Sequence, residues 1–285
     1  MPSIKKLVVL DNNEFNEPQK SELKSLAKEF SIFESQPAND EEAIKRIGNA
    51  DAVIVCWYSL SQKCIDSCHS LKYLGVVATG FGWLAAEYAS KKGITATNVP
   101  NYSTNAVSEF ILKNLETAGS LKGKTLGIIG LGHIGSRVAE LASKKGLKVI
   151  YWNRSPKKTK FESASFDEVF KKADIVVLQV KSNAETAGIV KNKNLDSLKA
   201  GAVIVNVVSP KLFESQEYLA SLVERKRLGL VLDFEEKSPL AEISSARVLY
   251  TKGIAWKSPE SIFNLHQIAL ENVMAFANGK PQNKI

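Results

Sequence analysis

The sequence predicts an α/β protein built from two doubly wound parallel-sheet domains. Three observations support this fold class. Short apolar segments alternate with amphipathic segments through both halves of the chain, a glycine-rich turn follows an apolar segment near its middle, and 285 residues with 44% hydrophobic content can form two cores. Regular alternation of this kind is typical of parallel sheets covered by helices.

The first half alternates short strands and helices up to residue 98. We expect strands over 7–10, 32–33, 52–56, 73–77 and 95–98, and helices over 19–30, 40–47, around Cys64 and over 84–90. No glycine fingerprint follows the first strand, where Asp11-Asn12-Asn13 stands. This half is therefore not expected to be the cofactor domain.

The second half begins with a helix that crosses from one domain to the other. Ser103 or Thr104 is its expected N-cap, and the helix runs through 106–112 and ends near Gly119. Six strands are expected over 126–129, 149–152, 175–178, 202–206, 228–232 and 248–250, followed by a last helix over 259–277. Six strands complete one doubly wound sheet.

The glycine-rich turn is the strongest chemical motif. It reads Gly130-Leu-Gly-His-Ile-Gly135 and lies between a strand and a helix, with a further strand after the helix. In such a turn Gly130 permits the turn, Gly132 lets the backbone approach a pyrophosphate, and Gly135 lets the helix pack on the sheet. The helix N-terminus, with His133 and Ile134 in its first turn, then favours the phosphates of a dinucleotide.

The end of the next strand predicts which dinucleotide binds. An NAD site places a carboxylate there for the ribose 2′-OH, whereas an NADP site has an arginine nearby. Here the residues are Asn153-Arg154-Ser155, followed by Lys157 and Lys158. We therefore favour NADP(H), with NAD(H) possible. The alternative is that Arg154 and these lysines form only a solvated loop.

Composition and charge exclude several classes of function. The net charge is +8, but the lysines occur as scattered pairs without interleaved aromatic residues, which argues against a nucleic-acid partner. No apolar segment is long enough to span a membrane and no signal peptide is apparent, so we expect a cytoplasmic protein. Cys56, Cys64 and Cys68 lack the spacing of metal ligands, so no metal is expected.

Motifs along nearly the whole chain resemble those of the D-isomer-specific 2-hydroxyacid dehydrogenases, particularly the glycerate dehydrogenases and the hydroxypyruvate or glyoxylate reductases. The resemblance rests on stretches 78–81, 93–104, 123–135, 173–178, 232–233 and 268–281. It implies a flavodoxin-like substrate domain over 1–98 and 260–285, and an inserted Rossmann domain over 99–259 that binds NAD(P). The implied active site lies in the cleft between the domains.

The resemblance also implies three catalytic side chains, and all three positions are changed. Ser209 stands where the family has an arginine, Ser238 where it has a glutamate, and Gly253 where it has a histidine. A shift of one or two residues in the alignment brings Glu235 or Glu236 near the glutamate position. Lys211 and Lys252 are candidates to replace the lost groups, although solvated loop lysines are the better interpretation. Packing or surface roles are favoured for His69, His133 and His266.

The cofactor and substrate residues are better preserved. The resemblance places Asp233 at the nicotinamide carboxamide, with Val180, Val207 and Gly253 also beside the cofactor, and it assigns the substrate carboxylate to the backbone of Thr79, Gly80 and Phe81. Lys181 replaces a usual proline. Only residues 113–122 stand where relatives have a long dimerisation arm, so an oligomer is possible but the familiar dimer is smaller, different or absent.

Two functions follow from this pattern. The first is an NAD(P)-dependent oxidoreductase with a non-standard active site, for which we favour NADPH as cofactor and a small 2-keto or 2-hydroxy acid as substrate. The second is a catalytically inactive NADP(H)-binding sensor or scaffold. The preserved substrate loop favours the first function, and the three lost catalytic side chains favour the second.

Overall fold

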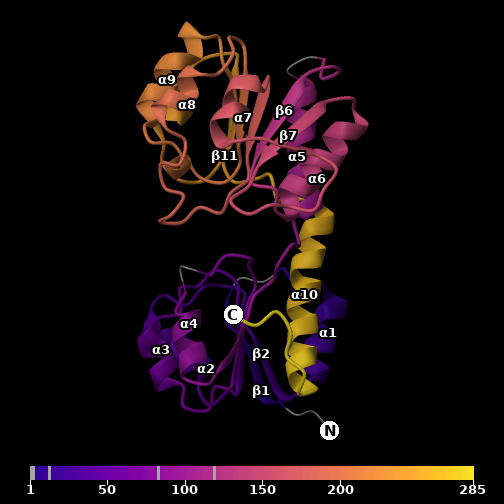
Figure 1. Cartoon of the computed structure of the whole chain (residues 1–285). Coiled ribbons are helices and arrows are strands. Elements are labelled where there is room, and N and C mark those ends of the chain that lie inside the picture. The colour runs from indigo at the N-terminus through magenta and orange to yellow at the C-terminus, as the bar shows by residue number, and fades with distance from the viewer. Residues whose placement is uncertain (1–3, 12–13, 82–83, 118–119) are drawn as a thin grey trace. The chain divides into compact units, whose positions relative to one another are not determined.

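The computed structural model describes residues 4–11, 14–81, 84–117 and 120–285, and the chain divides into two compact units (Figure 1). Unit 1 comprises residues 1–103 and 258–285, and unit 2 comprises residues 104–257. The sequence placed these boundaries at 98/99 and 259/260. Each unit is an α/β structure around its own parallel sheet, which is the predicted fold class.

Unit 1 contains a five-stranded sheet in the order β2-β1-β3-β4-β5. All its pairings are parallel, and β1 lies between β2 and β3, with Leu7 opposite Ala52 in register. This order is that of the flavodoxin-like fold. The strands are β1 (Ile4–Val9), β2 (Ala27–Ile32), β3 (Ala52–Val55), β4 (Tyr73–Val76) and β5 (Thr95–Thr97).

Helices cover both faces of this sheet, with α2, α3 and α4 on one face and α1 and α10 on the other (Figure 1). Their bounds are α1 (Glu17–Ser25), α2 (Asp40–Ile47), α3 (Gln62–Ser67), α4 (Ala86–Lys91) and α10 (Pro259–Ala277). The predictions for α2 and α10 are confirmed residue for residue.

The helix expected over 19–30 is wrong at its C-terminal end. It stops at Ser25, and residues 27–32 form β2, which pairs with β1. Ala27 and Phe30 continue the helical spacing of Leu23, but pairing with β1 decides the conformation because it satisfies the backbone of a whole strand.

The last helix, α10, returns the chain to unit 1. Its ring of Phe276 lies 4.7 Å from that of Tyr73 on β4, and Asn272 Nδ2 donates to the backbone oxygen of Asn98 at 2.8 Å. Residues far apart in the sequence therefore share one core.

Unit 2 contains a seven-stranded sheet in the order β12-β11-β10-β9-β6-β7-β8, again with parallel pairings. The order matches that of a dinucleotide-binding Rossmann sheet, which reverses direction between β6 and β9. The strands are β6 (Thr125–Ile129), β7 (Lys148–Trp152), β8 (Glu162–Ser163), β9 (Ile175–Leu178), β10 (Val203–Asn206), β11 (Gly229–Asp233) and β12 (Val248–Thr251).

The seventh strand, β8, was not expected. It has two exposed residues and carries no apolar pattern, so only its pairing with β7 defines it. The other six strands lie where they were predicted, within one or two residues.

Helices α5 and α6 pack on one face of the unit 2 sheet, and α7, α8 and α9 lie on the other (Figure 1). The crossing helix α5 begins at Thr104, and its expected end near Gly119 lies outside the described residues. The bounds are α5 (Thr104–Thr117), α6 (His133–Lys144), α7 (Phe166–Lys172), α8 (Asn192–Asp196), α9 (Gln216–Arg225), and two short 3₁₀ turns, η1 (Pro210–Leu212) and η2 (Pro239–Glu242).

Among the described helices, none combines the length and the apolarity needed to cross a membrane. Cys56, Cys64 and Cys68 are all buried and unbonded to one another.

Candidate functional site

The glycine turn leaves the carboxyl end of β6 beside the point where strand order reverses. Gly130 has φ +103°, and a Cβ atom there would lie 2.6 Å from the backbone oxygen of Gln179. A Cβ at Gly135 would lie 2.1 Å from the backbone oxygen of Gly130. A side chain at either position would therefore force the backbone to shift, so packing favours glycine at both.

Gly132 has a different environment. It has extended dihedral angles, and a Cβ there would meet no atom within 4 Å. Gly132 is the N-cap residue of α6, and no side chain among the described residues caps this helix. His133 is exposed and Ile134 is half-buried against the α5–α6 core. The N-terminus of α6 thus retains unsatisfied amides, which suits an anion such as a pyrophosphate.

The segment after β7 ties itself to this turn. Asn153 Oδ1 accepts from the backbone N–H of Leu131 at 3.0 Å, and its Nδ2 donates to the backbone oxygen of Ser155 at 2.9 Å. Both ends of the amide thus hold the turn in shape. Arg154 lies beside it with 79% of its side chain exposed, and its guanidinium pairs with Glu185 at 2.6 Å.

The ends of β9 and β10 contribute half-buried residues at the same edge of the sheet. Val180 and Val207 both pack against the core of unit 2, and exposed Lys181 follows Val180. Gln179 was not singled out from the sequence, yet its Nε2 is buried and has no hydrogen-bond partner in the described structure. The position of Gln179 directly after the apolar strand β9 was the sequence feature that could have identified it as a site residue. An unpaired donor here suits a ligand oxygen.

Asp233, at the end of β11, organises the loop after β12. Its carboxylate is 4% exposed and accepts from Thr251 Oγ1 at 2.6 Å and from the backbone N–H groups of Ile254 and Ala255 at 2.8 and 2.7 Å. A carboxylate has about four acceptor positions, so capacity for one further donor remains. The Asp233 carboxylate therefore stabilises the turn around Gly253 through these three hydrogen bonds.

Ser209 and Ser238 both begin 3₁₀ turns. Ser209 Oγ accepts from the N–H of Lys211 at 3.2 Å, and Ser238 Oγ accepts from the N–H of Leu240 at 3.1 Å. Each serine is followed by proline, a pattern typical of an N-cap. The Ser-Pro pairs are therefore a local capping signal in the sequence. Ser238 also donates to Gln216 Oε1 at 2.7 Å.

Two glutamates lie beside Ser209 and Gly253. Ser209 Oγ donates to Glu236 Oε2 at 2.6 Å, and Lys211 Nζ lies 3.1 Å from the other oxygen of the same carboxylate. Gly253 has φ +64°, and a Cβ there would lie 2.8 Å from Cγ of Glu235 and 3.0 Å from its Oε1. Glu236 thus contacts Ser209, and the Glu235 side chain lies against Gly253.

The remaining basic and imidazole candidates stand apart from this group. Lys252 is exposed, and no hydrogen bond or ion pair joins it to another described residue. His69 and His133 are exposed on other elements. His266 is 4% exposed on α10, where its Nδ1 bonds the backbone oxygen of Ile262 and its Nε2 accepts from the N–H of Glu14. Its place is in the core of unit 1.

In unit 1, the segment over Thr79, Gly80 and Phe81 follows β4. Thr79 Oγ1 donates to the backbone oxygen of Val99 at 2.7 Å, and the Thr79 backbone oxygen accepts from Asn98 Nδ2 at 2.7 Å. Phe81 packs on the unit 1 core, while Thr79 and Gly80 are exposed. The segment is therefore held at both sides with its backbone near the surface.

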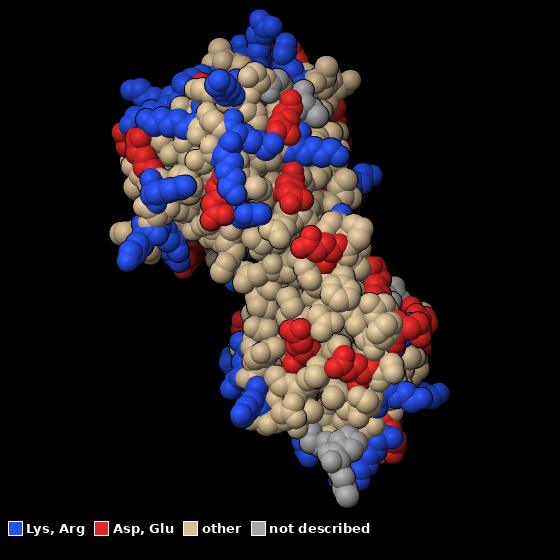
Figure 2. All heavy atoms as spheres, turned by 90° about the vertical axis from the view of Figure 1, so that its right-hand side faces the viewer, with Lys and Arg blue, Asp and Glu red and all other residues tan. Residues whose placement is uncertain are grey.

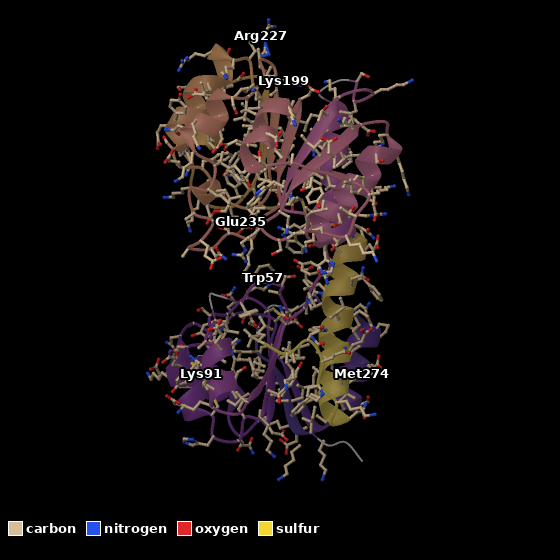
Figure 3. All side chains as sticks on the ribbon, viewed as in Figure 1. Trp57, Lys91, Lys199, Arg227, Glu235 and Met274 are labelled. Carbon is tan, nitrogen blue, oxygen red and sulfur yellow. The ribbon has the colours of Figure 1, made fainter. Side chains whose placement is uncertain are left out.

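Asp11 builds a second loop at the carboxyl edge of the unit 1 sheet. This fully buried carboxylate accepts from the backbone N–H groups of Cys56, Trp57 and Tyr58 at 2.8, 2.6 and 2.7 Å. Burial raises the pKa of the Asp11 carboxyl, and the three donors partly oppose that rise. Trp57, held by this loop, is 52% exposed (Figure 3). The position of Asp11 shortly after the buried strand β1 was the sequence feature that could have predicted this role.

Charge over unit 2 is mixed rather than concentrated. Figure 2 shows Lys and Arg side chains spread over the visible face of unit 2, with Asp and Glu side chains among them. Several of these charges form ion pairs, including Lys172 with Glu168 and Lys148 with Glu162. Over the part of the chain that the structure describes, no group of three potential ligands is arranged to hold a metal ion.

Comparison with known proteins relates this geometry to a family. Residues 95–256 match the family model described as D-isomer specific 2-hydroxyacid dehydrogenase, NAD binding domain. The hydroxypyruvate reductase of Blautia hydrogenotrophica is 28% identical, over 98% of this chain and 99% of that protein. The glyoxylate reductase of Aeropyrum pernix is 26% identical, over 94% of this chain and 92% of that protein.

Solved structures give the same relationship. An acyclic imino acid reductase (Bsp5), solved with NADPH and D-arginine, has a TM-score of 0.84 and 29% identity, with 98% of this chain and 99% of that one covered. A D-2-hydroxyisocaproate dehydrogenase has a TM-score of 0.85 at 19% identity, with 98% and 99% covered, and supports the fold alone.

Proposed function

The chain belongs to the family of D-isomer-specific 2-hydroxyacid dehydrogenases, and we propose that it is an NADPH-dependent reductase of a small 2-keto acid or related compound with a non-standard active site. The observation that carries the proposal is the open space at Gly132 beside the uncapped N-terminus of α6. A pyrophosphate fits that space, because backbone amides and the helix dipole both favour its charge.

The residues of the turn after β7 support NADP(H) over NAD(H). Asn153 is neutral and engaged in holding the glycine turn, so no carboxylate from this position meets the ribose. Arg154 is largely exposed, and its pairing with Glu185 is a surface ion pair of small net stability. A 2′-phosphate would offer this guanidinium two charge-assisted hydrogen bonds. The relative that was solved with NADPH supports the same choice.

Other residues take their places around the bound cofactor. Gln179 Nε2 would donate to a cofactor oxygen, Asp233 would accept from the carboxamide, and Val180 and Val207 would supply apolar contacts. The backbone of Thr79, Gly80 and Phe81 would hold the substrate carboxylate. The bound nicotinamide supplies the hydride. Because one relative is an imino acid reductase, imines belong among the substrates tested beside keto acids.

The rival function is a non-catalytic NADP(H) sensor or scaffold. It is favoured by the engagement of both serine hydroxyls in capping, since a capping hydroxyl that already donates to Glu236 or Gln216 is a poor replacement for a catalytic group. Both functions require the cofactor, and they differ in turnover.

The cofactor prediction is tested by titrating the protein with NADPH and NADH. NADPH should bind more tightly, and Arg154→Glu should weaken NADPH binding about 10- to 100-fold, because charge-assisted hydrogen bonds contribute about 1.5–3 kcal/mol. NADH binding should change little. Arg247→Glu, at the opposite edge of the sheet from the glycine turn, is the matched charge control.

Turnover separates the two functions. Glyoxylate, hydroxypyruvate and phenylpyruvate, each with and without ammonium chloride so that the 2-imino acids are tested as well, are added to the NADPH complex while nicotinamide absorbance is followed. Substrate-dependent oxidation supports the reductase, and tight binding without oxidation of any substrate supports the sensor. Tighter binding of NADH, or equal losses for both cofactors with Arg154→Glu, contradicts the NADP(H) assignment.

A further inference from the structure

Two glutamates on the loop after β11, Glu235 and Glu236, lie beside the changed positions Gly253 and Ser209. Glu236 is paired, since Ser209 Oγ and Lys211 Nζ both contact its carboxylate. Glu235 is not, because no hydrogen bond or ion pair joins its carboxylate to any other residue that the structure describes. The side chain of Glu235 instead lies against Gly253, where no side chain competes for the space.

The backbone that carries Glu235 is firmly anchored. Tyr250 Oη donates to the backbone oxygens of Phe234 and Glu236 at 2.9 and 3.2 Å, and the Phe234 and Tyr250 rings pack edge to face at 5.3 Å. Ser238 caps the turn that follows. Glu235 is thus an exposed carboxyl side chain on a loop whose backbone is anchored, directly beyond the Asp233 end of β11.

A carboxylate in this place suits one kind of substrate and opposes another. When hydride adds to a carbonyl, the oxygen gains negative charge and needs a cation or an acid beside it. A nearby carboxylate would raise that barrier. A protonated imine already carries positive charge on nitrogen, so the same carboxylate attracts it, and no proton has to be supplied while the hydride moves.

We propose that the substrate of this site is a protonated 2-imino acid, with Glu235 paired to its iminium nitrogen and Glu236, held by Ser209 and Lys211, positioning the loop. This rests on the proposed function, whose substrate class it narrows from keto acids to imines.

The reaction balances without a further reactant. The imine carbon accepts a hydride, whose electron pair comes from the C4–H bond that breaks on NADPH, and a new C–H bond forms. The π pair of the C=N bond becomes the lone pair of an amine, so the iminium charge is discharged. The amine then takes a proton from water to become the ammonium group of a 2-amino acid, and the nicotinamide is left oxidised.

The test measures NADPH oxidation by the full-length protein with three substrates. These are pyruvate alone, pyruvate with ammonium chloride at alkaline pH, and the stable cyclic imine Δ1-piperideine-2-carboxylate. We expect the imine-forming mixture and the cyclic imine to be reduced at least about 10-fold faster than pyruvate alone, with an amino acid as product.

Glu235→Gln should lower kcat/KM for the imines about 10- to 100-fold, as loss of a charged pairing does, and raise the rate with pyruvate by removing repulsion. Glu242→Gln, an exposed carboxylate on η2, is the matched control. The Kd for NADPH reports that each variant is folded.

Each remaining outcome is decisive. Equal rates with and without ammonium, or imine rates unaffected by Glu235→Gln, overturn the imine assignment while the reductase stands. Bound NADPH without oxidation by any substrate overturns both proposals in favour of the sensor, and failure to bind NADPH overturns the proposed function itself.

Discussion

At the scale of single residues, three glycines of one turn have different physical reasons to be glycine. Gly130 and Gly135 are fixed by contacts within the protein, since an added Cβ would lie 2.6 and 2.1 Å from backbone oxygens. Gly132 has no such contact. The fold itself therefore does not require glycine at 132, and a ligand that approaches the backbone there would.

Because only Gly135 has close contacts within the protein, alanine at 135 should affect stability, whereas alanine at 132 should affect cofactor binding. Gly135→Ala should lower the free energy of unfolding by about 1–3 kcal/mol, because the new methyl group overlaps the Gly130 carbonyl and forces the helix to shift. Gly132→Ala should leave stability unchanged and weaken NADPH binding about 10-fold or more, since its methyl group would occupy the space of the phosphates. Urea unfolding and NADPH titration measure the two effects. Equal NADPH affinity of Gly132→Ala and wild type would contradict the placement of the pyrophosphate.

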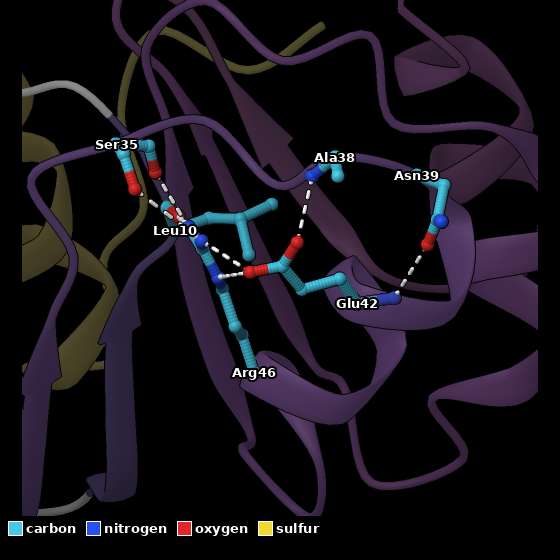
Figure 4. Close-up of polar contacts among 6 residues, drawn as sticks. All are labelled: Leu10, Ser35, Ala38, Asn39, Glu42 and Arg46. Atoms are coloured by element: carbon cyan, nitrogen blue, oxygen red, sulfur yellow. Dashed lines mark hydrogen bonds and ion pairs between the residues drawn. The ribbon is translucent and has the colours of Figure 1, made fainter.

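At the scale of elements, Arg46 connects helix α2 to two neighbouring segments of unit 1 (Figure 4). The Arg46 guanidinium donates to the backbone oxygens of Leu10 and Ser35, and it also pairs with Glu42 one turn earlier in the helix. Its side chain is only 10% exposed. Glu42 itself accepts from the N–H of Ala38, and Asn39 caps the helix. The arginine thus connects the end of β1, the loop before α2 and the helix.

Removing this arginine should be costly. Arg46→Ala leaves the Leu10 carbonyl without its side-chain donor, and we expect a loss of about 1–3 kcal/mol in the free energy of unfolding. Lys63→Ala removes an exposed pair with Glu41 and should change stability little, because surface ion pairs contribute weakly. Denaturant unfolding followed by circular dichroism compares the two variants. Equal effects would show that Arg46 acts only as a surface charge.

At the scale of the whole molecule, the C-terminal helix α10 contacts the N-terminal part of unit 1 through the buried side chain of His266. His266 lies edge to face with Phe15 at 4.6 Å, and it joins the segment before α1 to α10 by accepting from Glu14 N–H. Burial lowers the pKa of His266 below its usual 6.5, against smaller opposing contributions from Ile262 and Glu14. The imidazole is therefore neutral when unit 1 is folded.

Stability should consequently fall as the pH falls below about 6.5. In this range the unfolded chain binds a proton at His266 that the folded chain resists, so acid favours unfolding with a limiting slope of about 1.4 kcal/mol per pH unit. Urea unfolding at several pH values measures the slope. His266→Gln should flatten it, and His69→Gln, at an exposed site, should not. An unchanged slope in His266→Gln would assign the pH dependence to other groups.

Prediction from sequence worked best where the signal is local. Helix α2 and helix α10 follow from caps and periodicity, and β9 from a short apolar run, because each signal lies within the element. It was wrong for residues 26–30, where pairing with β1 overrides helical spacing, and it missed the two-residue strand β8. Those elements depend on a neighbouring strand that local patterns do not identify.

Some features of the candidate site can likewise be read from the sequence, whereas others depend on the tertiary structure. The sequence by itself determined the glycine turn and the absence of a carboxylate after β7, since these depend on residue identity at fixed spacing, and the change of the usual catalytic side chains stays a prediction from the family resemblance. Only the tertiary structure decided that Glu236 meets Ser209 and that Glu235 fills the space beside Gly253. These contacts join the ends of strands that are adjacent in the sheet but separated along the chain, and side-chain reach between such ends is set by packing rather than by local sequence.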